Sequence, residues 1–266
     1  MSEDLPVSVH ILTFNSARTL ARTIESVHGC KEILVLDGGS TDDTRAIAQK
    51  YGAHMIEQQT KEKQGTPLTN FAEARNRGLR ESNEPWILAL DSDEYASLSL
   101  MNELRMVMQE HTPCACWIPR KYVTAGNRIV THATTYPNER LYFFHRNTVT
   151  QWIKPVHEKP EVKPDAPVRH LKGGSVAPLG SVAEYKRKNL RYLAIECEKD
   201  TRKGWGHWFI HRLLHTLRSR CIALLKLLWI WCIPRKNCVR LPLKHELLRF
   251  WYGWKLVVKT CPLSRP

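Results

Sequence analysis

The sequence predicts an α/β protein in which a mostly parallel sheet is flanked by helices and followed by a basic helical extension. β-Branched and apolar runs alternate with segments whose apolar residues have helical spacing, and polar turns separate them. The charge is unevenly divided. Residues 151–266 hold 24 of the 40 Lys and Arg but only 8 of the 26 Asp and Glu, so they carry the excess positive charge.

The composition is that of a globular chain large enough to bury a full core. It has 266 residues, 42% of them hydrophobic and 25% charged. The start "MSEDLPVSVHIL" contains no signal or transit peptide pattern, which predicts a cytoplasmic protein. The eight cysteines form no Cys-x-x-Cys pair, so we interpret them as reduced packing residues; a zinc site using Cys232 and Cys238 is the alternative.

The first predicted unit is a strand, a loop and a helix. Residues 7–14, "VSVHILTF", form a β-branched run. Asn15 and Ser16 then serve as a helix cap, and residues 17–27 continue with apolar side chains at helical spacing.

The same pattern repeats directly afterwards. A strand over residues 32–36 ends at Asp37, and a glycine pair turns the chain. Ser40 or Thr41 then caps a helix that stops at Gly52.

Four further segments complete the predicted half-sheet. They are a short strand near 53–57, a polar loop over 58–68, a helix near 69–81 and the strand "WILAL" over 86–90. Strands and helices that alternate at these lengths predict parallel strands joined by right-handed crossovers. Ligands of such sheets bind at the carboxyl ends of the strands.

Two aspartates follow the last of these strands. Asp91 and Asp93 can project to one side while Ser92 points away, because side chains alternate along extended backbone. Paired carboxylates of this kind hold Mg²⁺ or Mn²⁺, with substrate phosphates completing the coordination. The alternative is a cap at the start of a helix.

The predicted topology brings these acids close to the ends of the other strands, near Thr13 to Asn15 and Asp37. A dinucleotide-binding fold would need Gly-x-Gly-x-x-Gly after the first strand, and "TFNSARTL" contains no glycine. A haloacid-dehalogenase-type phosphatase would carry Asp-x-Asp after its first strand rather than its fourth. Both classes are therefore disfavoured.

Three stretches together resemble a known family. "VSVHILTFNSARTLARTIESV", "VLDGGSTDDT" and "WILALDSDE" are similar to the nucleotide-sugar-binding half of family 2 inverting glycosyltransferases, which have the GT-A fold. The chain most resembles the bacterial lipopolysaccharide core group. The resemblance implies a catalytic domain over residues 1–180, divided into a donor half (1–95) and an acceptor half (96–180), with a helical extension over 181–266.

The resemblance also implies which residues bind the donor nucleoside. Thr13, Asn15 and Asp37 would contact it, although Asp37 could instead cap a turn. A uridine nucleotide is expected. Many family members, however, have two acids where this chain has Asp37-Gly38, and this departure leaves the contact with the base, and so the choice of nucleoside, open.

Further donor contacts are implied by the helix "FAEARNRGLRES" and the aspartate pair. Arg75 and Asn76 would face the nucleotide; for Arg75 the alternative is an ordinary solvated helix position. Asp91 would lie in the donor site and, with Asp93, would hold Mg²⁺ or Mn²⁺. The bound ion would stabilise negative charge on the departing phosphate.

The acceptor side begins with strands. Residues 117–130 alternate like a hairpin that turns at Gly126-Asn127, and "YPNERLYFFHRN" adds another strand. Arg140 in that stretch would bind a phosphate or form a cross-strand ion pair.

The stretch Val156-His157-Glu158 is typical of the lipopolysaccharide core group and implies the catalytic base. Glu158 is the first candidate for removing the acceptor hydroxyl proton. His157 is the second, with a loop hydrogen-bonding role as its alternative. Glu94 also competes, unless it is a first-turn helix acid.

The tail predicts a membrane-surface segment. Residues 201–266 contain 14 Lys and Arg and one acid, mixed with leucines and tryptophans. The apolar stretch 221–233 is shorter than the roughly 20 residues that span a bilayer. Basic amphipathic helices favour anionic lipid, although these helices could instead pack on the catalytic domain.

These features predict a metal-dependent inverting glycosyltransferase, peripheral on the inner face of the cell membrane. It would move a sugar from a nucleotide-sugar donor, with a UDP-sugar expected, to a glycan or glycolipid acceptor. The alternative is a non-catalytic protein that binds membrane or nucleic acid through its basic region. Nucleic acid is not expected, because the tail lacks a recognisable reading motif.

Overall fold

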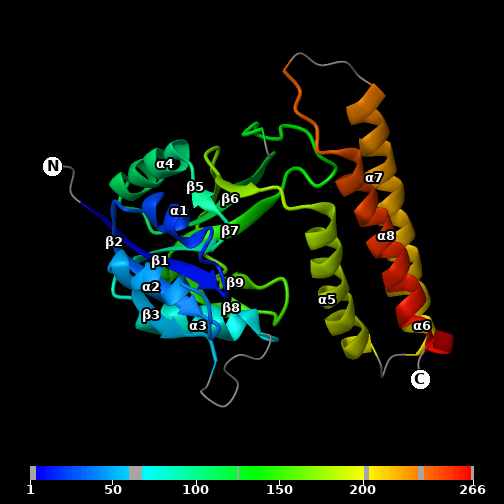
Figure 1. The fold of residues 1–266 in the computed structure, drawn as a ribbon, viewed down its shortest axis with the longest axis horizontal. Coiled ribbons are helices and arrows are strands. Elements are labelled where there is room, and N and C mark those ends of the chain that lie inside the picture. The colour runs from blue at the N-terminus through cyan, green and yellow to red at the C-terminus, as the bar shows by residue number, and fades with distance from the viewer. Residues whose placement is uncertain (1–3, 60–67, 125, 201–203, 233–236, 265–266) are drawn as a thin grey trace. The chain divides into compact units, whose positions relative to one another are not determined.

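A computed structural model describes residues 4–59, 68–124, 126–200, 204–232 and 237–264 of the chain. The chain divides into two compact units. The first comprises Met1–Tyr122 and Pro137–Pro178, and the second comprises Val123–Tyr136 and Leu179–Pro266. The first unit contains most of the strands and the second contains the longest helices (Figure 1).

The first unit is built on a mixed sheet with the strand order β3-β2-β1-β4-β7-β6-β11-β5, in which β10 also pairs with β6. The strands β1, β2, β3 and β4 pair in parallel, as predicted, while β7 is antiparallel to both β4 and β6. A separate hairpin is formed by β8 and β9. The bounds are β1 (Leu5–Thr13), β2 (Cys30–Asp37), β3 (His54–Glu57), β4 (Trp86–Asp91), β5 (Tyr95–Ala96), β6 (Ala115–Val123), β7 (Glu139–His145), β8 (Val149–Ile153), β9 (Lys159–Val162), β10 (Val168–His170) and β11 (Ser175–Pro178).

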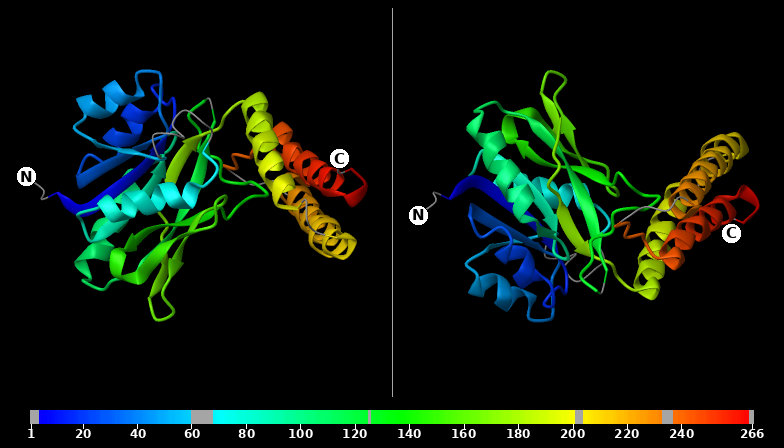
Figure 2. Two further views of the ribbon diagram at one scale, coloured as in Figure 1. Left: turned by 90° about the horizontal axis from the view of Figure 1, so that it is seen from below. Right: turned by 90° about the horizontal axis from the view of Figure 1, so that it is seen from above.

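Helices cover both faces of the parallel strands. They are α1 (Leu20–Glu25), α2 (Thr44–Lys50), α3 (Phe71–Glu81) and α4 (Leu98–Gln109), with a 3₁₀ turn, η2, at Arg146–Thr148. Figure 2 shows α1 and α2 on one side of these strands and α3 on the other. The middle strands β1 and β4 are therefore almost fully buried, which is why their sequences are continuous apolar runs rather than alternating ones.

The first helix starts later than predicted. It begins at Leu20, after Thr19, and Asn15 and Ser16 do not cap it. Asn15 instead has a positive φ of 50°, and its side-chain oxygen accepts a hydrogen bond from the N–H of Thr41 at 2.8 Å. The loop after β1 is thus tied to the loop after β2 rather than to its own helix.

The second helix also has a different cap. It begins at Thr44 after Asp43, so neither Ser40 nor Thr41 caps it. The predicted stop is confirmed. Gly52 has φ +67°, and its N–H donates to the carbonyl of Gln49, as expected for a glycine that ends a helix.

The predicted hairpin over 117–130 is present only in part. After β6, Val123 forms an isolated bridge with Ile129, and Asn127, at φ 55°, lies in the turn. The second strand predicted on this side is confirmed as β7. Of the predicted loop 58–68, residues 60–67 lie outside the described residues.

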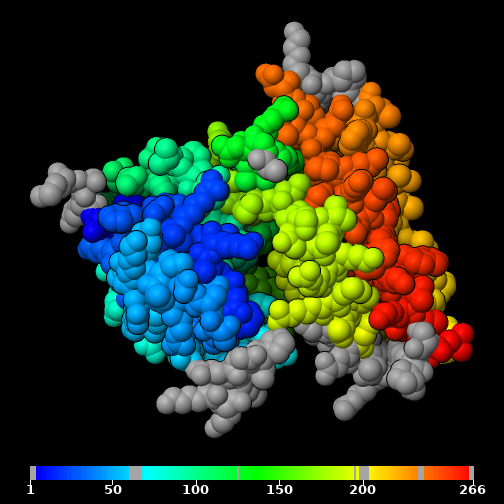
Figure 3. Space-filling view, in the orientation of Figure 1, coloured from blue at the N-terminus to red at the C-terminus, as the bar shows by residue number. Residues whose placement is uncertain are grey.

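The second unit contains the helices predicted for the C-terminal region. They are α5 (Val182–Asp200), α6 (Trp205–His207), the π-helical η3 (Trp208–Leu214), α7 (His215–Cys232), α8 (Leu243–Thr260) and the 3₁₀ turn η4 (Pro262–Ser264). Figure 3 shows the side chains of α8 lying along those of α7. None of the described helices has the length and hydropathy that a bilayer-spanning segment requires.

Candidate active site

The carboxyl ends of three parallel strands meet at one edge of the sheet. The strand register pairs Thr13 with Asp37, and Leu12 with Asp91. The N–H of Ser92 donates to the carbonyl of Leu12 at 3.0 Å, which holds the turn after β4 against β1. The predicted meeting of these strand ends is confirmed.

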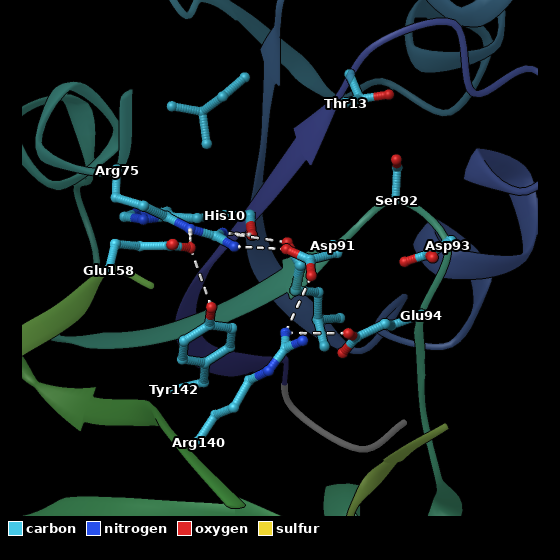
Figure 4. A network of polar contacts seen from close by, with 12 residues as sticks. His10, Thr13, Arg75, Asp91, Ser92, Asp93, Glu94, Arg140, Tyr142 and Glu158 are labelled. Atoms are coloured by element: carbon cyan, nitrogen blue, oxygen red, sulfur yellow. Dashed lines mark hydrogen bonds and ion pairs between the residues drawn. The ribbon is translucent and has the colours of Figure 1, made fainter. Parts of the chain in front are cut away.

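Three carboxylates gather in the turn after β4. Asp91, Asp93 and Glu94 each offer an oxygen within 4.8 Å of the others. The hydroxyl of Ser92 forms a hydrogen bond with Ser16 Oγ at 2.7 Å, on the side away from the acids (Figure 4). Asp91 and Asp93 therefore face one site, as the alternation of the sequence predicts.

The helix-cap interpretation of this stretch is wrong. The next helix, α4, begins only at Leu98, and its cap is Ser97, whose hydroxyl accepts from the N–H of Leu100 at 3.2 Å. Glu94 precedes the short strand β5, so it is not a first-turn helix acid either.

Three arginines neutralise this acidic group. Asp91 accepts from Arg75 Nη2 at 2.9 Å and from Arg140 Nη1 at 3.0 Å. Glu94 is buried and accepts from Arg140 Nη1 at 3.0 Å and from Arg120 Nε. The ion-pair interpretation of Arg140 is confirmed.

Burial disfavours the charged form of these arginines, but the neighbouring carboxylates outweigh it. For both Arg120 and Arg140, Glu94 is the strongest favourable influence, and the pKa is raised above its ordinary value. Both side chains are therefore held as cations beside Glu94.

The acidic group fits a divalent cation. Asp93 is half exposed and faces outward, while Glu94 Oε2 is buried with no hydrogen-bond partner among the described residues. Both oxygens of Asp91 are hydrogen-bonded, although each retains a lone pair. Oxygen-only ligands suit Mg²⁺ or Mn²⁺. Within the part of the chain that the structure describes, no other group of three or more metal-ligating side chains is found.

Glu158 lies on the opposite side of Arg75 from Asp91 (Figure 4). Its Oε1 accepts from the hydroxyl of Tyr142 at 3.1 Å and lies 3.8 Å from Arg75 Nε. The side chain is 12% exposed, so it is held in place yet open to a substrate. Burial raises the pKa of Tyr142, which therefore stays a donor to this carboxylate.

The helix α3 anchors the hairpin that presents Glu158. The side-chain amide of Asn76 donates to the backbone carbonyl of Trp152 at 3.0 Å and accepts from the backbone N–H of Trp152 at 2.7 Å. The N–H of Phe71 donates to the carbonyl of Pro155 at 2.8 Å. His157, in the same loop, is exposed and has a positive φ of 56°, a conformation that costs energy for a non-glycine residue.

These contacts change the interpretation of the helix residues predicted to face the nucleotide. Arg75 is fully buried, so it is not a solvated helix residue, and Nη1 donates to the carbonyls of His10 and Leu90. The amide of Asn76 is engaged by β8. Contact of either residue with a nucleotide stays a prediction.

The predicted nucleoside contacts occupy the strand ends. Thr13 is buried, and its hydroxyl has no hydrogen-bond partner among the described residues. Asp37 accepts from the N–H and hydroxyl of Ser40 and lies 3.5 Å from Arg45, so here it does cap the turn. Its contact with a nucleoside stays a prediction, as does that of Asn15.

Arg120 and Tyr142 are site residues that the sequence reasoning missed. Alternation along β6 places Arg120 in phase with the buried Ile118 and Tyr122. A cation in the buried phase of a strand requires an acidic partner, and this signal was available in the sequence.

The family is decided by a sequence match that covers more than half of the chain. The model of the family described as "Glycosyl transferase family 2" matches residues 8–159. The chain belongs to glycosyl transferase family 2. The matched region includes the acidic group and Glu158.

Curated relatives cover parts of the same region. The lipopolysaccharide core biosynthesis glycosyltransferase LpsC of Rhizobium meliloti is 29% identical over 123 residues, 44% of this chain and 42% of LpsC. An uncharacterized glycosyltransferase of Rickettsia felis is 36% identical over 106 residues, 40% of this chain and 35% of that protein. The chain thus spans less than half the length of these two relatives.

Solved structures show distant likeness. S. aureus TarS is 15% identical, with 95% of this chain and 55% of that chain covered and a TM-score of 0.45. Glucosyl-3-phosphoglycerate synthase from Mycobacterium tuberculosis, in complex with Mn²⁺, UDP and phosphoglyceric acid, is 18% identical, with 69% and 74% covered and a TM-score of 0.44. The family assignment rests on the sequence match alone.

Proposed function

We propose that the chain is a metal-dependent inverting glycosyltransferase that uses a nucleotide-sugar donor, most simply a UDP-sugar, and a lipid-linked or lipopolysaccharide-core-type glycan acceptor. One observation carries the proposal: a group of acids suited to a divalent ion and a separate, partly exposed carboxylate lie on two sides of one buried arginine, Arg75.

The acids at the strand ends are the donor side of the proposed site. Thr13, Asn15 and Asp37 would receive the nucleoside, because they follow the neighbouring strands at the same edge. Asp93, with Asp91 beside it, would hold Mg²⁺ or Mn²⁺ against the donor diphosphate. The bound ion supplies stabilisation of the negative charge on the leaving phosphate.

The arginines have different roles in this proposal. The side chain of Arg140 is 24% exposed, so it can reach a donor phosphate while remaining paired with Asp91. Arg75 is inaccessible, so we assign it the positioning of Asp91 and Glu158 rather than a nucleotide contact.

Glu158 acts as the general base. It removes the proton of the acceptor hydroxyl as that oxygen forms its bond to the anomeric carbon, and the bond from that carbon to the diphosphate oxygen breaks. Attack from the face opposite the leaving group inverts the configuration. His157 is the second candidate base. Glu94 is the weakest, because it is buried and its Oε1 is bonded to two arginines.

The surface of the second unit is the reason to propose an acceptor bound to a membrane. Its helices expose many large apolar side chains among their cations, a combination favoured at an anionic lipid surface. The exposed large apolar residues on α7 are Leu217, Ile222, Leu224, Leu225, Leu228, Trp229 and Trp231. We place the protein on the inner face of the cell membrane, where nucleotide sugars and lipid-linked glycans meet.

A transfer assay tests the proposal. Purified protein is incubated with labelled nucleotide sugars and bacterial membrane glycolipids, and labelled lipid is measured with and without EDTA. We expect Mn²⁺- or Mg²⁺-dependent labelling that Asp93→Asn removes and Asp165→Asn, a matched change at an exposed aspartate, preserves. Labelling that survives both EDTA and Asp93→Asn would overturn the metal-dependent mechanism.

A further inference from the structure

The second unit contains a pocket of about 430 Å³ formed by α7, α8 and the segment before β7. The α7 residues that line it recur every three or four positions, so they form one stripe along the helix. They are His215, Arg218, Ser219, Ile222, Ala223 and Lys226. Thr134 and Arg249 complete the lining.

The pocket has an excess of positive charge. Arg218, Lys226 and Arg249 line it, and the single acid between residues 201 and 266 is Glu246. Glu246 is buried, and its two oxygens receive the N–H and the hydroxyl of Thr134. Arg218 and Lys226 bring guanidinium and ammonium donors to the lining, and Arg with Lys is the usual pair for phosphate oxygens.

Part of this lining is held in a fixed position. Arg249 Nη1 donates to the hydroxyl of Thr134, which in turn donates to Glu246. In addition, Arg220 Nη1 donates to the backbone carbonyl of Arg249 at 2.7 Å. Burial, and next the charge of Arg249, lower the pKa of Arg220.

The close approach of α7 and α8 depends on a glycine. A Cβ at Gly253 would lie 3.1 Å from Arg220 Nε and 3.2 Å from the Thr216 methyl group. The helices can therefore pack tightly enough for Arg249 and Arg218 to line the same cavity.

We propose that this pocket binds the phosphate group of an anionic lipid, as a phosphomonoester or diphosphate headgroup. Ile222 and Ala223 give the pocket an apolar side, and α7 exposes Leu225 and Trp229, side chains that favour acyl chains over water. Its volume lies in the range of small-ligand sites and suits a phosphorylated headgroup. The inference concerns the second unit alone and holds whether or not the proposed transfer reaction is correct.

The first arm of the test uses inorganic pyrophosphate. Binding is measured by calorimetry in EDTA without nucleotide, so that metal binding at the acidic group makes no contribution. We expect Arg218→Gln with Lys226→Gln to weaken binding at least about tenfold. Lys244→Gln with Lys255→Gln, which removes two exposed charges of α8 outside the pocket, should leave it nearly unchanged. Equal weakening in both variants would overturn the site.

The second arm distinguishes a lipid from a free anion. Vesicles containing phosphatidic acid are compared with phosphatidylserine vesicles of equal surface charge. We expect a preference for phosphatidic acid that the pocket variant loses and the α8 variant keeps, and competition between these vesicles and pyrophosphate. Pyrophosphate binding without vesicle competition would assign the pocket to a soluble anion and contradict the proposal. The single variant Arg218→Gln, at an exposed side chain, repeats both arms if the double variant does not fold.

Discussion

A single guanidinium, that of Arg75, lies between the two halves of the proposed chemistry. It donates to backbone carbonyls of β1 and β4 and to Asp91, and its Nε is 3.8 Å from Glu158. Because it is fully buried, its position is set by the sheet rather than by solvent. The distance between the acidic group after β4 and Glu158 is therefore built into the fold.

The role of Glu158 predicts a separation of binding from transfer. In Glu158→Gln the amide keeps a hydrogen bond with Tyr142 but cannot take a proton. We expect nucleotide binding to remain within about twofold, while transfer falls by 10² to 10⁴, the usual contribution of a general base. Calorimetry and the lipid-labelling assay measure the two quantities, with Glu81→Gln, at an exposed position on α3, as the control. Loss of nucleotide binding equal to the loss of transfer would contradict this role.

The buried pair of Glu94 and Arg120 is expected to stabilise the turn after β4. Replacing either residue by Gln leaves its partner as a buried charge with too little opposite charge around it. The expected cost is about 3 kcal/mol in the free energy of unfolding. Both changes together should cost clearly less than the sum of the single changes. Urea unfolding of the four proteins measures this coupling, and strictly additive costs would show that the pair is not coupled.

At this scale the strand-end acids could be predicted and their partners could not. The run "WILALDSDE" is enough to place Asp91 and Asp93 at the end of a strand. The ion pairs of Glu94 depend on the pairing of β7 with β4 and of β6 with β7, and these antiparallel pairings carry no local sequence signal.

The hairpin of β8 and β9 depends on α3 for its position. The Asn76 side chain forms hydrogen bonds with the backbone carbonyl and the backbone N–H of Trp152. The N–H of Phe71 donates to the carbonyl of Pro155. The helix "FAEARNRGLRES" thus holds the loop that carries Glu158.

Asn76→Ala is expected to loosen this hairpin. Two hydrogen bonds to the backbone of the buried Trp152 are lost, each worth about 1 kcal/mol. Amide exchange over residues 149–162 should become faster, and transfer should fall more than nucleotide binding. Arg80→Ala, which removes only an exposed ion pair from the same helix, is the control. Unchanged exchange in the hairpin of Asn76→Ala would contradict the anchoring role.

Element order followed from the alternation of the sequence, while helix starts did not. The stop at Gly52 has a local cause, a backbone conformation that glycine favours. The predicted start of α1 was wrong because the Asn15 side chain accepts a hydrogen bond from the N–H of Thr41, 26 residues away. That contact exists only once β1 and β2 are paired.

At the scale of the whole molecule, charge is divided between a nearly neutral sequence half and a strongly basic one. Residues 1–150 hold 16 Lys and Arg against 18 acids, while residues 151–266 hold the surplus of cations. The acidic group after β4 is internally balanced by its arginines, so we expect anionic partners to be attracted mainly by the basic half of the sequence.

The stability of the fold is expected to depend on pH through His10 in the middle of β1. Burial, and then the charges of Arg75 and Arg146, lower its pKa to about 3. Between that value and the ordinary 6.5, the unfolded chain binds a proton that the folded chain does not, so this contribution is complete above about pH 6.5 and is lost as the pH falls. From pH 7 to pH 5 the loss is about 2 kcal/mol.

Urea unfolding at the two pH values measures this effect. A His10→Gln variant lacks the titrating group, so its free energy of unfolding should fall by about 2 kcal/mol less than that of the wild type over this interval. Equal losses in the two proteins would show that His10 is not the group responsible.

The proposed function requires that the acids after β4 form a metal-dependent site for a nucleoside diphosphate. Calorimetric titration of UDP and other nucleoside diphosphates, with and without Mn²⁺, tests it most directly in wild type, Asp93→Asn and Asp165→Asn. We expect one nucleotide to bind tightly only with Mn²⁺, in the wild type and Asp165→Asn but not in Asp93→Asn. Absence of nucleotide binding under every condition, or binding that neither Mn²⁺ nor Asp93→Asn alters, would contradict the claim.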